Sequence, residues 1–304
     1  MRVAVTGATG TIGRALVGAL LDRGDEVVAL GRDAERATRA LPPGTAVVEW
    51  RRPEAEPAPV QALAGADAVV HLAGAPVAQR WTRRAKEAIR SSRVEGTRNL
   101  VAGIAAAEPR PRVLVSQSAS GYYGPRGDER VDESAPPGPG FLASVAAAWE
   151  AEARKAAELG LRVACTRTGV VLSPSGGALA KMLPPFRLGL GGPVAGGRQY
   201  VPWVHLDDVV GALLLCLGDE RAEGPVNVAA PEPVTNRDLS RTLGRVLGRP
   251  AVLPVPALAL RVLYGEMATI VTTGVRMVPR RLAELGYRFH HPELEPALRA
   301  ATGR

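Results

Sequence analysis

The chain has 304 residues, of which 46% are hydrophobic and 22% charged, and its mean hydropathy is +0.02. This predicts a large core, in one big domain or in one domain with a smaller companion. The net charge is +8 with a pI of about 10.1, which favours anionic partners. The arginines are scattered, with no basic tail, so we expect no nucleic-acid partner and interpret the charge mainly as solvated surface.

Cysteine and histidine usage argues against a disulfide framework and against a metal site. Cys165 and Cys216 lie in apolar runs and are interpreted as buried small hydrophobic residues. The four histidines show no ligand spacing. No apolar stretch is long enough to span a bilayer, and the first residues lead straight into a strand without a leader pattern. We therefore predict a cytoplasmic protein without metal or membrane partners; the oligomeric state is left open.

The first thirty residues predict a strand, a helix and a second strand. The short apolar run Arg2–Val5 suits a strand that is buried on both faces. The sequence T-G-A-T-G-T-I-G follows at 6–13, and apolar residues then recur at helical spacing until Gly24. Glu26–Leu30 is the second predicted strand. The result is a βαβ unit with glycines in its first turn.

The glycines of that turn predict a dinucleotide-binding loop. Gly7 permits the tight turn, Gly10 lets a phosphate approach the backbone, and Gly13 lets the helix pack on the strand. The pyrophosphate would lie at the helix N-terminus, where free N–H groups and the helix dipole favour anions. An ordinary βα turn is the alternative, but the position between a strand and a helix at the chain start argues against it.

The end of the second strand predicts which dinucleotide binds. An acidic residue there would bind the ribose 2′-hydroxyl of NAD, whereas this chain has Gly31 and Arg32. The planar guanidinium of arginine suits the 2′-phosphate of NADP. Asp33 keeps NAD open as an alternative, unless it caps the helix that follows. We predict NADP(H) as the cofactor.

Further stretches continue the alternation of strands and helices. They are a buried strand with a small-residue turn (67–74), a long amphipathic helix (81–106), a strand entering a polar loop (112–124) and another strand (161–172). This order predicts a Rossmann-type α/β fold, a doubly wound parallel sheet with helices on both faces. Ligands of such sheets lie beyond the carboxyl ends of the strands, here Leu72-Ala73-Gly74, Ser116–Tyr123 and Thr168–Val171.

With these features the chain resembles the extended short-chain dehydrogenases/reductases, and more closely an epimerase-like, NADP-binding branch of that superfamily. The likeness spans essentially the whole chain, and the middle and C-terminal blocks are specific to the branch. The segments that carry it are TGATGTIG, the strand-end Gly31-Arg32, HLAGAPV, RWT…SSR…TRNLV, SASGYYG, FLASVAAAWEAEA, RTGVVL, PPFRLGLGGPVAGGRQYVPWVHLDD and ALRVLYGEMATIVTTGVRMVPRRLAELGYRFHHPELEPAL.

The resemblance implies two domains and a set of NADP contacts. Residues 1–172 would form the NADP-binding domain, to which 204–229 return, and 173–304 would form a smaller C-terminal α/β substrate domain. Together with their neighbours in the same motifs, the predicted cofactor-binding residues are Gly7, Thr9, Gly10, Thr11, Ile12, Gly13, Gly31, Arg32, Leu72, Ala73, Gly74, Arg93 and Val171. For Arg93 the alternative is a solvated arginine on the surface of a helix.

The catalytic pair of the superfamily is missing. Catalytic members carry Tyr-x-x-x-Lys on a helix, where the tyrosine transfers the substrate proton and the lysine lowers the pKa of its hydroxyl. This chain has Phe141 and Val145 at those positions, and Trp149 continues the same apolar face. The resemblance thus implies a helix that is retained without its acid–base pair.

Three residues of the strand and polar loop at 112–124 are the candidate catalytic residues. Ser118 is the expected equivalent of the serine that holds the substrate oxygen, and Tyr122 or Tyr123 would handle the proton. Core packing beside the cofactor is the alternative for both tyrosines.

Other segments have one functional and one structural interpretation each. His205 and Asp207 would either face the site or form a structural pair, and Lys181 would either border the site or end a helix in solvent. The glycine-rich segment 189–197 would be a lid or a turn-rich connection.

Two functions are compatible with these features. The first is an NADP(H)-dependent oxidoreductase or epimerase with a small carbonyl, hydroxyl or sugar-nucleotide substrate. The alternative is a non-catalytic NADP(H)-binding redox sensor or regulatory protein, which the missing pair favours. The preserved polar loop within 112–124 and the PFRLGLGGP segment favour the enzyme. We therefore predict an enzyme with a small molecule as its partner.

Overall fold

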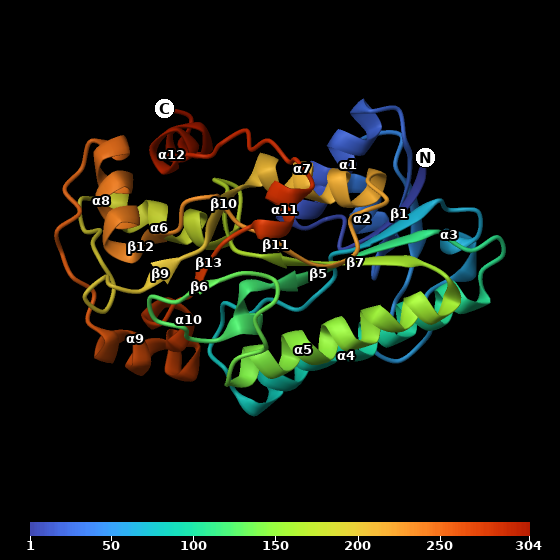
Figure 1. Ribbon diagram of the computed structural model, residues 1–304, viewed down its shortest axis with the longest axis horizontal. Helices are drawn as coiled ribbons and strands as arrows, with labels where there is room; N and C mark the ends of the chain where they lie inside the picture. Colours follow the sequence, from blue (N-terminus) through green and yellow to red (C-terminus); the bar gives the residue numbers. More distant parts are fainter.

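A seven-stranded parallel sheet forms the centre of the protein, whose computed structural model describes residues 1–304 (Figure 1). The strand order is β11-β7-β5-β4-β1-β2-β3. Its members are β1 (Arg2–Thr6), β2 (Glu26–Gly31), β3 (Ala46–Glu49), β4 (Ala68–His71), β5 (Val113–Ala119), β7 (Arg162–Thr168) and β11 (Gly224–Val228). The chain moves outward from β1 to β3 and then returns to the other side of β1 with β4. This topological switch point lies between β1 and β4, where such sheets bind ligands, and it confirms the predicted Rossmann-type fold.

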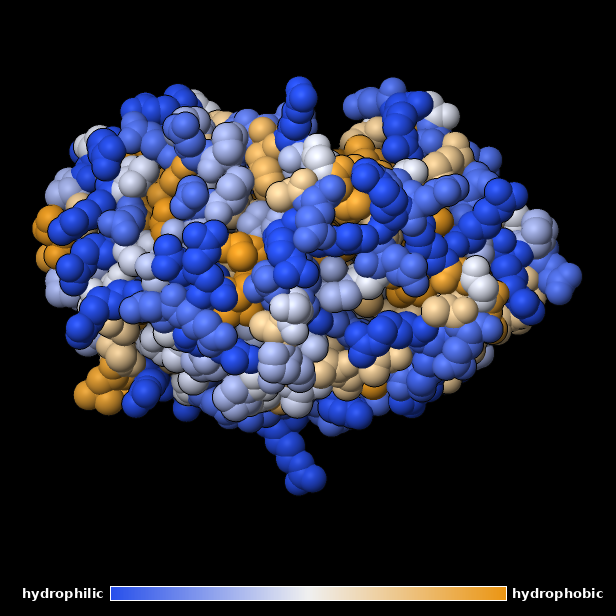
Figure 2. Space-filling view, in the orientation of Figure 1, coloured by the Kyte–Doolittle hydropathy of each residue, from blue (hydrophilic) through white to orange (hydrophobic).

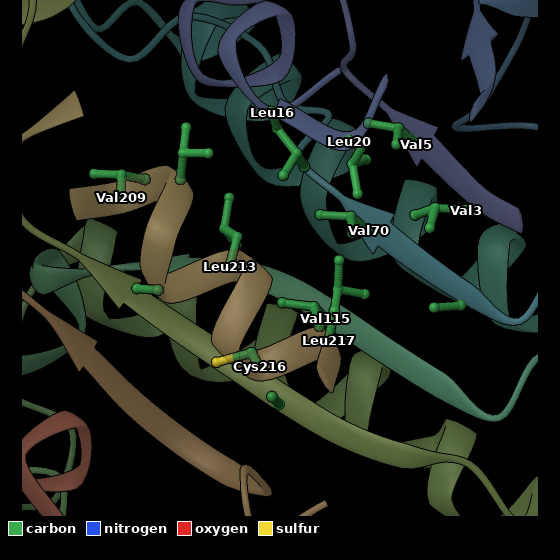
Figure 3. Packing of buried hydrophobic residues seen from close by; sticks show 14 of the residues in the cluster. Val3, Val5, Leu16, Leu20, Val70, Val115, Val209, Leu213, Cys216 and Leu217 are labelled. Carbon is green, nitrogen blue, oxygen red and sulfur yellow. The ribbon is translucent and has the colours of Figure 1, made fainter. Parts of the chain in front are cut away.

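Helices cover both faces of the sheet (Figure 1). One face carries α1 (Thr11–Asp22), α2 (Ala34–Ala40), α7 (Leu206–Gly218) and α11 (Arg280–Glu284); the other carries α3 (Val60–Leu63), α4 (Arg83–Ala106), α5 (Phe141–Arg154) and the 3₁₀ turn η2 (Lys155–Leu159). Alternate residues of β1 enter the two cores: Val3 and Val5 pack with α1 and α7, and Ala4 packs on the α4 side (Figure 3). This burial on both faces explains the continuous apolar runs of the strands.

The prediction of one strand over 161–172 is wrong, because this stretch forms two strands. β7 ends at Thr168, and β8 (Val170–Leu172) leaves the sheet to pair with β10 (Trp203–His205). The break is at Gly169, where an added Cβ atom would lie 1.9 Å from the carbonyl oxygen of Pro202. Only glycine allows the two chain segments to cross so closely, and β8 therefore turns toward the smaller region of the protein.

The smaller region gathers at one end of the sheet (Figure 1). It contains α6 (Gly177–Arg187), β9 (Tyr200–Val201), β12 (Val234–Thr235), α8 (Asn236–Leu247), α9 (Ala257–Tyr264), the 3₁₀ turn η3 (Gly265–Ala268), α10 (Thr269–Thr272) and α12 (Leu294–Thr302). Leu179, Trp203, Leu243 and Leu298 are among the residues of its separate core. A short parallel pair, β6 (Arg130–Val131) with β13 (Arg276–Met277), joins the loop before α5 to this region.

The two regions are interleaved along the chain. α7 and β11 belong to the central sheet and its core, which is where the resemblance placed residues 204–229. α11 also belongs there, because Leu282 and Leu285 pack into the same core. The sequence analysis did not anticipate this second return, and it left the whole of 230–304 in the smaller domain.

Most large hydrophobic side chains that remain exposed lie in the smaller region. They are Leu188, Leu190, Val252, Leu253, Leu258, Val262, Leu263, Tyr264, Ile270 and Val271. Figure 2 shows apolar atoms over α9 at the lower left, against a largely hydrophilic surface elsewhere on this face. No helix is both long enough and apolar enough to cross a bilayer.

Candidate functional site

The glycine loop joins β1 to α1 at the switch point of the sheet. Gly7 has a φ of +67°, and an added Cβ atom would lie 2.7 Å from the carbonyl carbon of Leu72. A Cβ atom on Gly13 would lie 2.3 Å from the carbonyl oxygen of Gly7. Gly10 is the N-cap of α1, and no side chain caps the free N–H groups of the first turn. The loop thus leaves a bare helix N-terminus, the geometry that binds a pyrophosphate.

A cavity of about 220 Å³ lies against this loop. Its lining includes seven of the predicted cofactor-binding residues: Gly7, Gly10, Thr11, Ile12, Gly13, Leu72 and Val171. Gln117, Gly176 and Gly177 also line it, and the sequence analysis missed them. Gly176 lies so close to α1 that an added Cβ atom would be 2.1 Å from the Thr11 hydroxyl oxygen. For Gln117 the signal was available, since it lies in the predicted strand end Ser116–Tyr123. Gly176 is the N-cap of α6, four residues beyond the end of β8.

The end of β2 meets the requirement for a 2′-phosphate. Arg32 is exposed, whereas the Asp33 carboxylate caps α2 by accepting a 2.9 Å hydrogen bond from the backbone N–H of Arg36. Asp33 therefore caps the helix, which is the structural alternative that the sequence left open, and Arg32 is the charged side chain without a partner at the strand end. Gly31 precedes Arg32 at the strand end, and Thr9 is exposed on the glycine loop outside the lining of the cavity.

Arg93 is not a solvated surface arginine. Its guanidinium donates to the carbonyl oxygens of Ala75 (3.0 Å) and Ile89 (3.2 Å) and lies 5.2 Å from the ring centre of Trp149. Burial lowers the pKa of Arg93 to about 10. A Cβ atom on Gly74 would lie 3.0 Å from this guanidinium. Arg93 thus borders the loop after β4, next to the predicted contacts Leu72 and Ala73.

A buried histidine that the sequence analysis missed holds the same loop. His71 Nδ1 lies 2.7 Å from the Thr6 hydroxyl and Nε2 lies 2.9 Å from the Thr97 hydroxyl. The Thr6 oxygen also accepts hydrogen bonds from the N–H groups of Leu72 (3.2 Å) and Ala73 (3.3 Å), so its own hydrogen is available to Nδ1. Burial lowers the pKa of His71 to about 4, so the ring stays neutral.

Ser118 and Tyr123 belong to a buried polar network between β5, β7 and α5. The Ser118 hydroxyl donates to Glu150 at 2.7 Å, and the Arg167 guanidinium makes two further bonds to the same carboxylate, at 2.8 and 2.9 Å. The Tyr123 hydroxyl donates to Asn227 at 2.6 Å and accepts from Arg167 at 2.9 Å. Both side chains are buried, and burial raises the pKa of Tyr123 to about 12. These contacts favour the packing alternative for Tyr123.

Tyr122 differs from its neighbour. It is only half-buried, its ring centre lies 3.5 Å from the Arg167 guanidinium carbon, and it meets the Tyr123 ring edge to face. Its hydroxyl has no hydrogen-bond partner within the protein, which leaves Tyr122 as the one predicted catalytic hydroxyl that is free to act.

The apolar face of α5 packs against the start of α4. Phe141, the first residue of α5, meets Trp81 edge to face with 5.3 Å between ring centres, and the Lys86 ammonium lies 5.2 Å from the Phe141 ring centre. Val145 is buried, as is Trp149, whose indole N–H has no hydrogen-bond partner. The face that carries tyrosine and lysine in catalytic members of the superfamily is therefore filled by packing residues.

The remaining candidates have structural contacts. His205 caps α7, since its Nδ1 accepts from the backbone N–H of Asp207 at 3.2 Å, and Asp207 also approaches His291 at 3.3 Å. This favours the structural interpretation of the His205–Asp207 pair. Lys181 of α6 donates to the carbonyl oxygen of Ala78 at 3.0 Å, so it joins the smaller region to the loop after β4 rather than ending a helix in solvent.

Fold and loop geometry together define a Rossmann-type protein built to bind a dinucleotide. Residues 3–229 match the model of the NAD dependent epimerase/dehydratase family, and residues 255–301 match a domain of unknown function, DUF1731. The chain belongs to the NAD dependent epimerase/dehydratase family, which confirms the predicted resemblance.

Relatives with similarity along the whole chain support this membership. The epimerase family protein SDR39U1 homolog, chloroplastic, of Arabidopsis thaliana is 41% identical over 99% of this chain and 86% of its own length. The crystal structure of human epimerase family protein SDR39U1 (isoform2) with NADPH is 35% identical, with a TM-score of 0.88 over 100% of this chain and 99% of that one. A nucleoside-diphosphate sugar epimerase from Corynebacterium glutamicum is 33% identical, with a TM-score of 0.78 over 100% of this chain and 58% of that longer chain.

Proposed function

We propose that this protein binds NADP(H) and acts as an oxidoreductase or epimerase on a small carbonyl, hydroxyl or sugar-nucleotide substrate. The choice of NADP(H) rests on the end of β2, where the Arg32 side chain is exposed without a partner and Asp33 caps α2. The solved human relative, crystallised with NADPH, supports the same choice.

The residues around the glycine loop fit a dinucleotide. The bare N-terminus of α1 would hold the pyrophosphate, Arg32 would hold the 2′-phosphate, and Arg93 would face the sugar beyond the loop after β4. Thr9, Thr11, Ile12, Ala73, Gly74 and Val171 complete the proposed contacts. When bound, the cofactor supplies hydride transfer at its nicotinamide ring.

The smaller region supports a substrate site because it closes over the carboxyl ends of the strands. Lys181 bonds the loop after β4, and Arg80 on that loop donates to the carbonyl oxygens of Val262 (3.2 Å) and Leu263 (3.3 Å). The 33% identical relative that is named a nucleoside-diphosphate sugar epimerase favours a sugar nucleotide among the substrate classes.

The sensor remains the second candidate, and the observation that favours it is the packing of α5. Phe141 and Val145 have no proton to transfer to a substrate. The hydroxyls of Ser118 and Tyr123 form hydrogen bonds inside the core. Among the predicted catalytic residues, Tyr122 is therefore the only one whose hydroxyl is not engaged in a hydrogen bond within the protein.

Titration with the two reduced cofactors tests the proposal. NADPH should bind well ahead of NADH, and Arg32→Ala should remove most of the preference, since a charge-assisted contact contributes about 1.5–3 kcal/mol, or roughly 10–150-fold in affinity. Arg39→Ala is the matched control, because Arg39 lies seven residues further on, in the last turn of α2, and pairs with Glu35. Equal affinity of the unmodified protein for both cofactors would contradict the proposal.

Turnover separates the enzyme from the sensor. The unmodified protein is assayed with NADPH on simple aldehydes and ketones, and with UDP-glucose and UDP-glucuronic acid as sugar-nucleotide probes. Silence on every probe, combined with different protease sensitivity in NADPH and NADP⁺, would favour the sensor over the enzyme.

A further inference from the structure

A charged pair from outside α5 lies against Phe141, the residue at the position of the missing tyrosine. Lys86, in the first turn of α4, brings its ammonium to 5.2 Å from the ring centre of Phe141, the residue at the tyrosine position. The same ammonium is paired with the carboxylate of Glu266 in η3. An acid and a base thus meet beside the residue that stands at the tyrosine position.

We propose that Lys86, held by Glu266, is the proton donor and acceptor of this site in place of the missing Tyr-x-x-x-Lys pair. This inference rests on the proposed enzymatic function. It extends that function by naming a residue that none of the sequence motifs indicated.

The choice of a lysine at this position supports the inference. The chain contains only three lysines among its 38 lysine and arginine residues: Lys86, Lys155 and Lys181. Arginine stays protonated in proteins, whereas a lysine ammonium can give up its proton. A contact that merely holds two parts of the protein together would be served equally well by arginine, which the chain uses for almost every other ion pair.

The geometry around Lys86 suits proton exchange. The Lys86 side chain is 31% exposed and that of Glu266 is 49% exposed, so water reaches both. Gly265, with a φ of +63°, ends α9 and turns the chain so that Glu266 faces α4. The other charged groups nearby are Arg80 on the loop before α4 and Arg83 and Arg90, which lie about one turn away on α4 itself.

NADPH is the reductant in the proposed step. The carbonyl carbon of the substrate accepts a hydride from the reduced nicotinamide, and the C=O π pair becomes a lone pair on oxygen. That oxygen takes a proton from the Lys86 ammonium, and the resulting neutral amine regains a proton from water. In the oxidation direction the neutral amine accepts the proton of the substrate hydroxyl, and the hydride of the carbinol carbon passes to NADP⁺ as the oxidant.

A first experiment needs no turnover. Trace acetylation of the full chain with acetic anhydride over a pH series, read by mass spectrometry, reports the apparent pKa of each lysine separately. Lys86 should react faster with the reagent in saturating NADP⁺ than in saturating NADPH, because the positive charge of the oxidised nicotinamide disfavours a second cation beside it. Lys155, which pairs with Glu152 at the far end of α5, should show no difference. Identical labelling of Lys86 in both cofactors would overturn the proposal while leaving NADPH binding, and with it the proposed function, intact.

A second experiment separates proton transfer from an ion-pair latch. Lys86→Arg keeps the positive charge beside Glu266 and should lower NADPH-dependent reduction of 4-nitrobenzaldehyde or phenanthrenequinone by about 10²-fold or more, with unchanged NADPH affinity and melting temperature. Lys155→Arg should change nothing. Glu266→Gln removes the carboxylate that holds the Lys86 ammonium and should lower the same activity. Full activity of Lys86→Arg, together with its loss in Tyr122→Phe, would assign the proton to Tyr122 and overturn the proposal.

Discussion

The glycine loop and the start of α5 stand at the superfamily's cofactor-binding and catalytic positions, and they differ in what those positions require. The loop would act through its backbone, which requires that positions 7, 10 and 13 carry no side chain. The chain has glycine at all three positions, Gly7, Gly10 and Gly13. α5 would act through two side chains, and Phe141 and Val145 supply neither function.

The helix persists because the core depends on it. Glu150 of α5 accepts from Ser118 and Arg167, and Trp149 packs edge to face on His71 with 6.4 Å between ring centres. A catalytic pair can therefore be lost from one end of a helix while buried contacts further along preserve its position. The comparison predicts that α5 matters most for stability and the glycine loop most for ligand binding.

The largest effect on stability should come from Arg167. Arg167→Met removes both bonds to the buried Glu150 carboxylate and leaves it with one cation only, the half-exposed Arg154 at a longer 3.4 Å. This should lower the free energy of unfolding by about 3–5 kcal/mol. Urea denaturation measures the loss. Arg98→Met is the matched control, because Arg98 also pairs with a carboxylate of α5, that of Glu152, but is 54% exposed and should cost only about 0–1 kcal/mol. Equal losses in the two variants would refute a structural role for the Arg167–Glu150 pair.

The next effect concerns His71 at the end of β4, which contacts Thr6 before the glycine loop and Trp149 of α5. This histidine should make the stability of the protein depend on pH. Its pKa is lowered from 6.5 to about 4, so the unfolded chain takes up a proton below pH 6.5 that the folded protein refuses until about pH 4. Stability from this residue is fully present above pH 6.5 and is lost as the pH falls toward 4, by about 3 kcal/mol. His71→Asn does not titrate, so urea unfolding at a series of pH values should show a shallower decline. Parallel curves for the two proteins would contradict this assignment.

A smaller effect on stability, but a decisive one on binding, is expected at Gly13. In Gly13→Ala the new methyl group meets backbone atoms of Gly7 and Ala8, which cannot move aside like a side chain, and this should cost about 1–3 kcal/mol and abolish NADPH binding. Gly18→Ala, one turn further along α1, has open space around it and should stabilise the protein by up to about 1 kcal/mol. Retention of tight NADPH binding by Gly13→Ala would show that the dinucleotide does not use this loop.

The same comparison explains what could be predicted from the sequence. The glycine loop, Arg32 and the order of strands follow from local patterns, because close backbone approach needs glycine and buried parallel strands need apolar runs. The contacts of Lys86 with Glu266 and of His71 with Thr97 join residues distant in the sequence, and no local pattern marks them. The break at Gly169 depends on a contact with Pro202, which the strand-like sequence around it conceals.

The smallest effect on stability should come from Phe141. Its size tests whether this side chain belongs to the hydrophobic core or lies beside the proposed catalytic lysine. A fully buried phenylalanine costs about 3–5 kcal/mol when cut to alanine, but Phe141 is only half-buried and packs mainly on Trp81. Phe141→Ala should therefore cost about 1–2 kcal/mol, in proportion to the apolar area it shields. Phe141→Leu, which keeps most of that area, should cost less, and urea unfolding of the two variants measures the difference. A loss as large as that of a fully buried ring would place Phe141 in the core and remove it from the border of the site. A small loss, together with altered acetylation of Lys86 in Phe141→Ala, would place the ring where it shapes the surroundings of that ammonium.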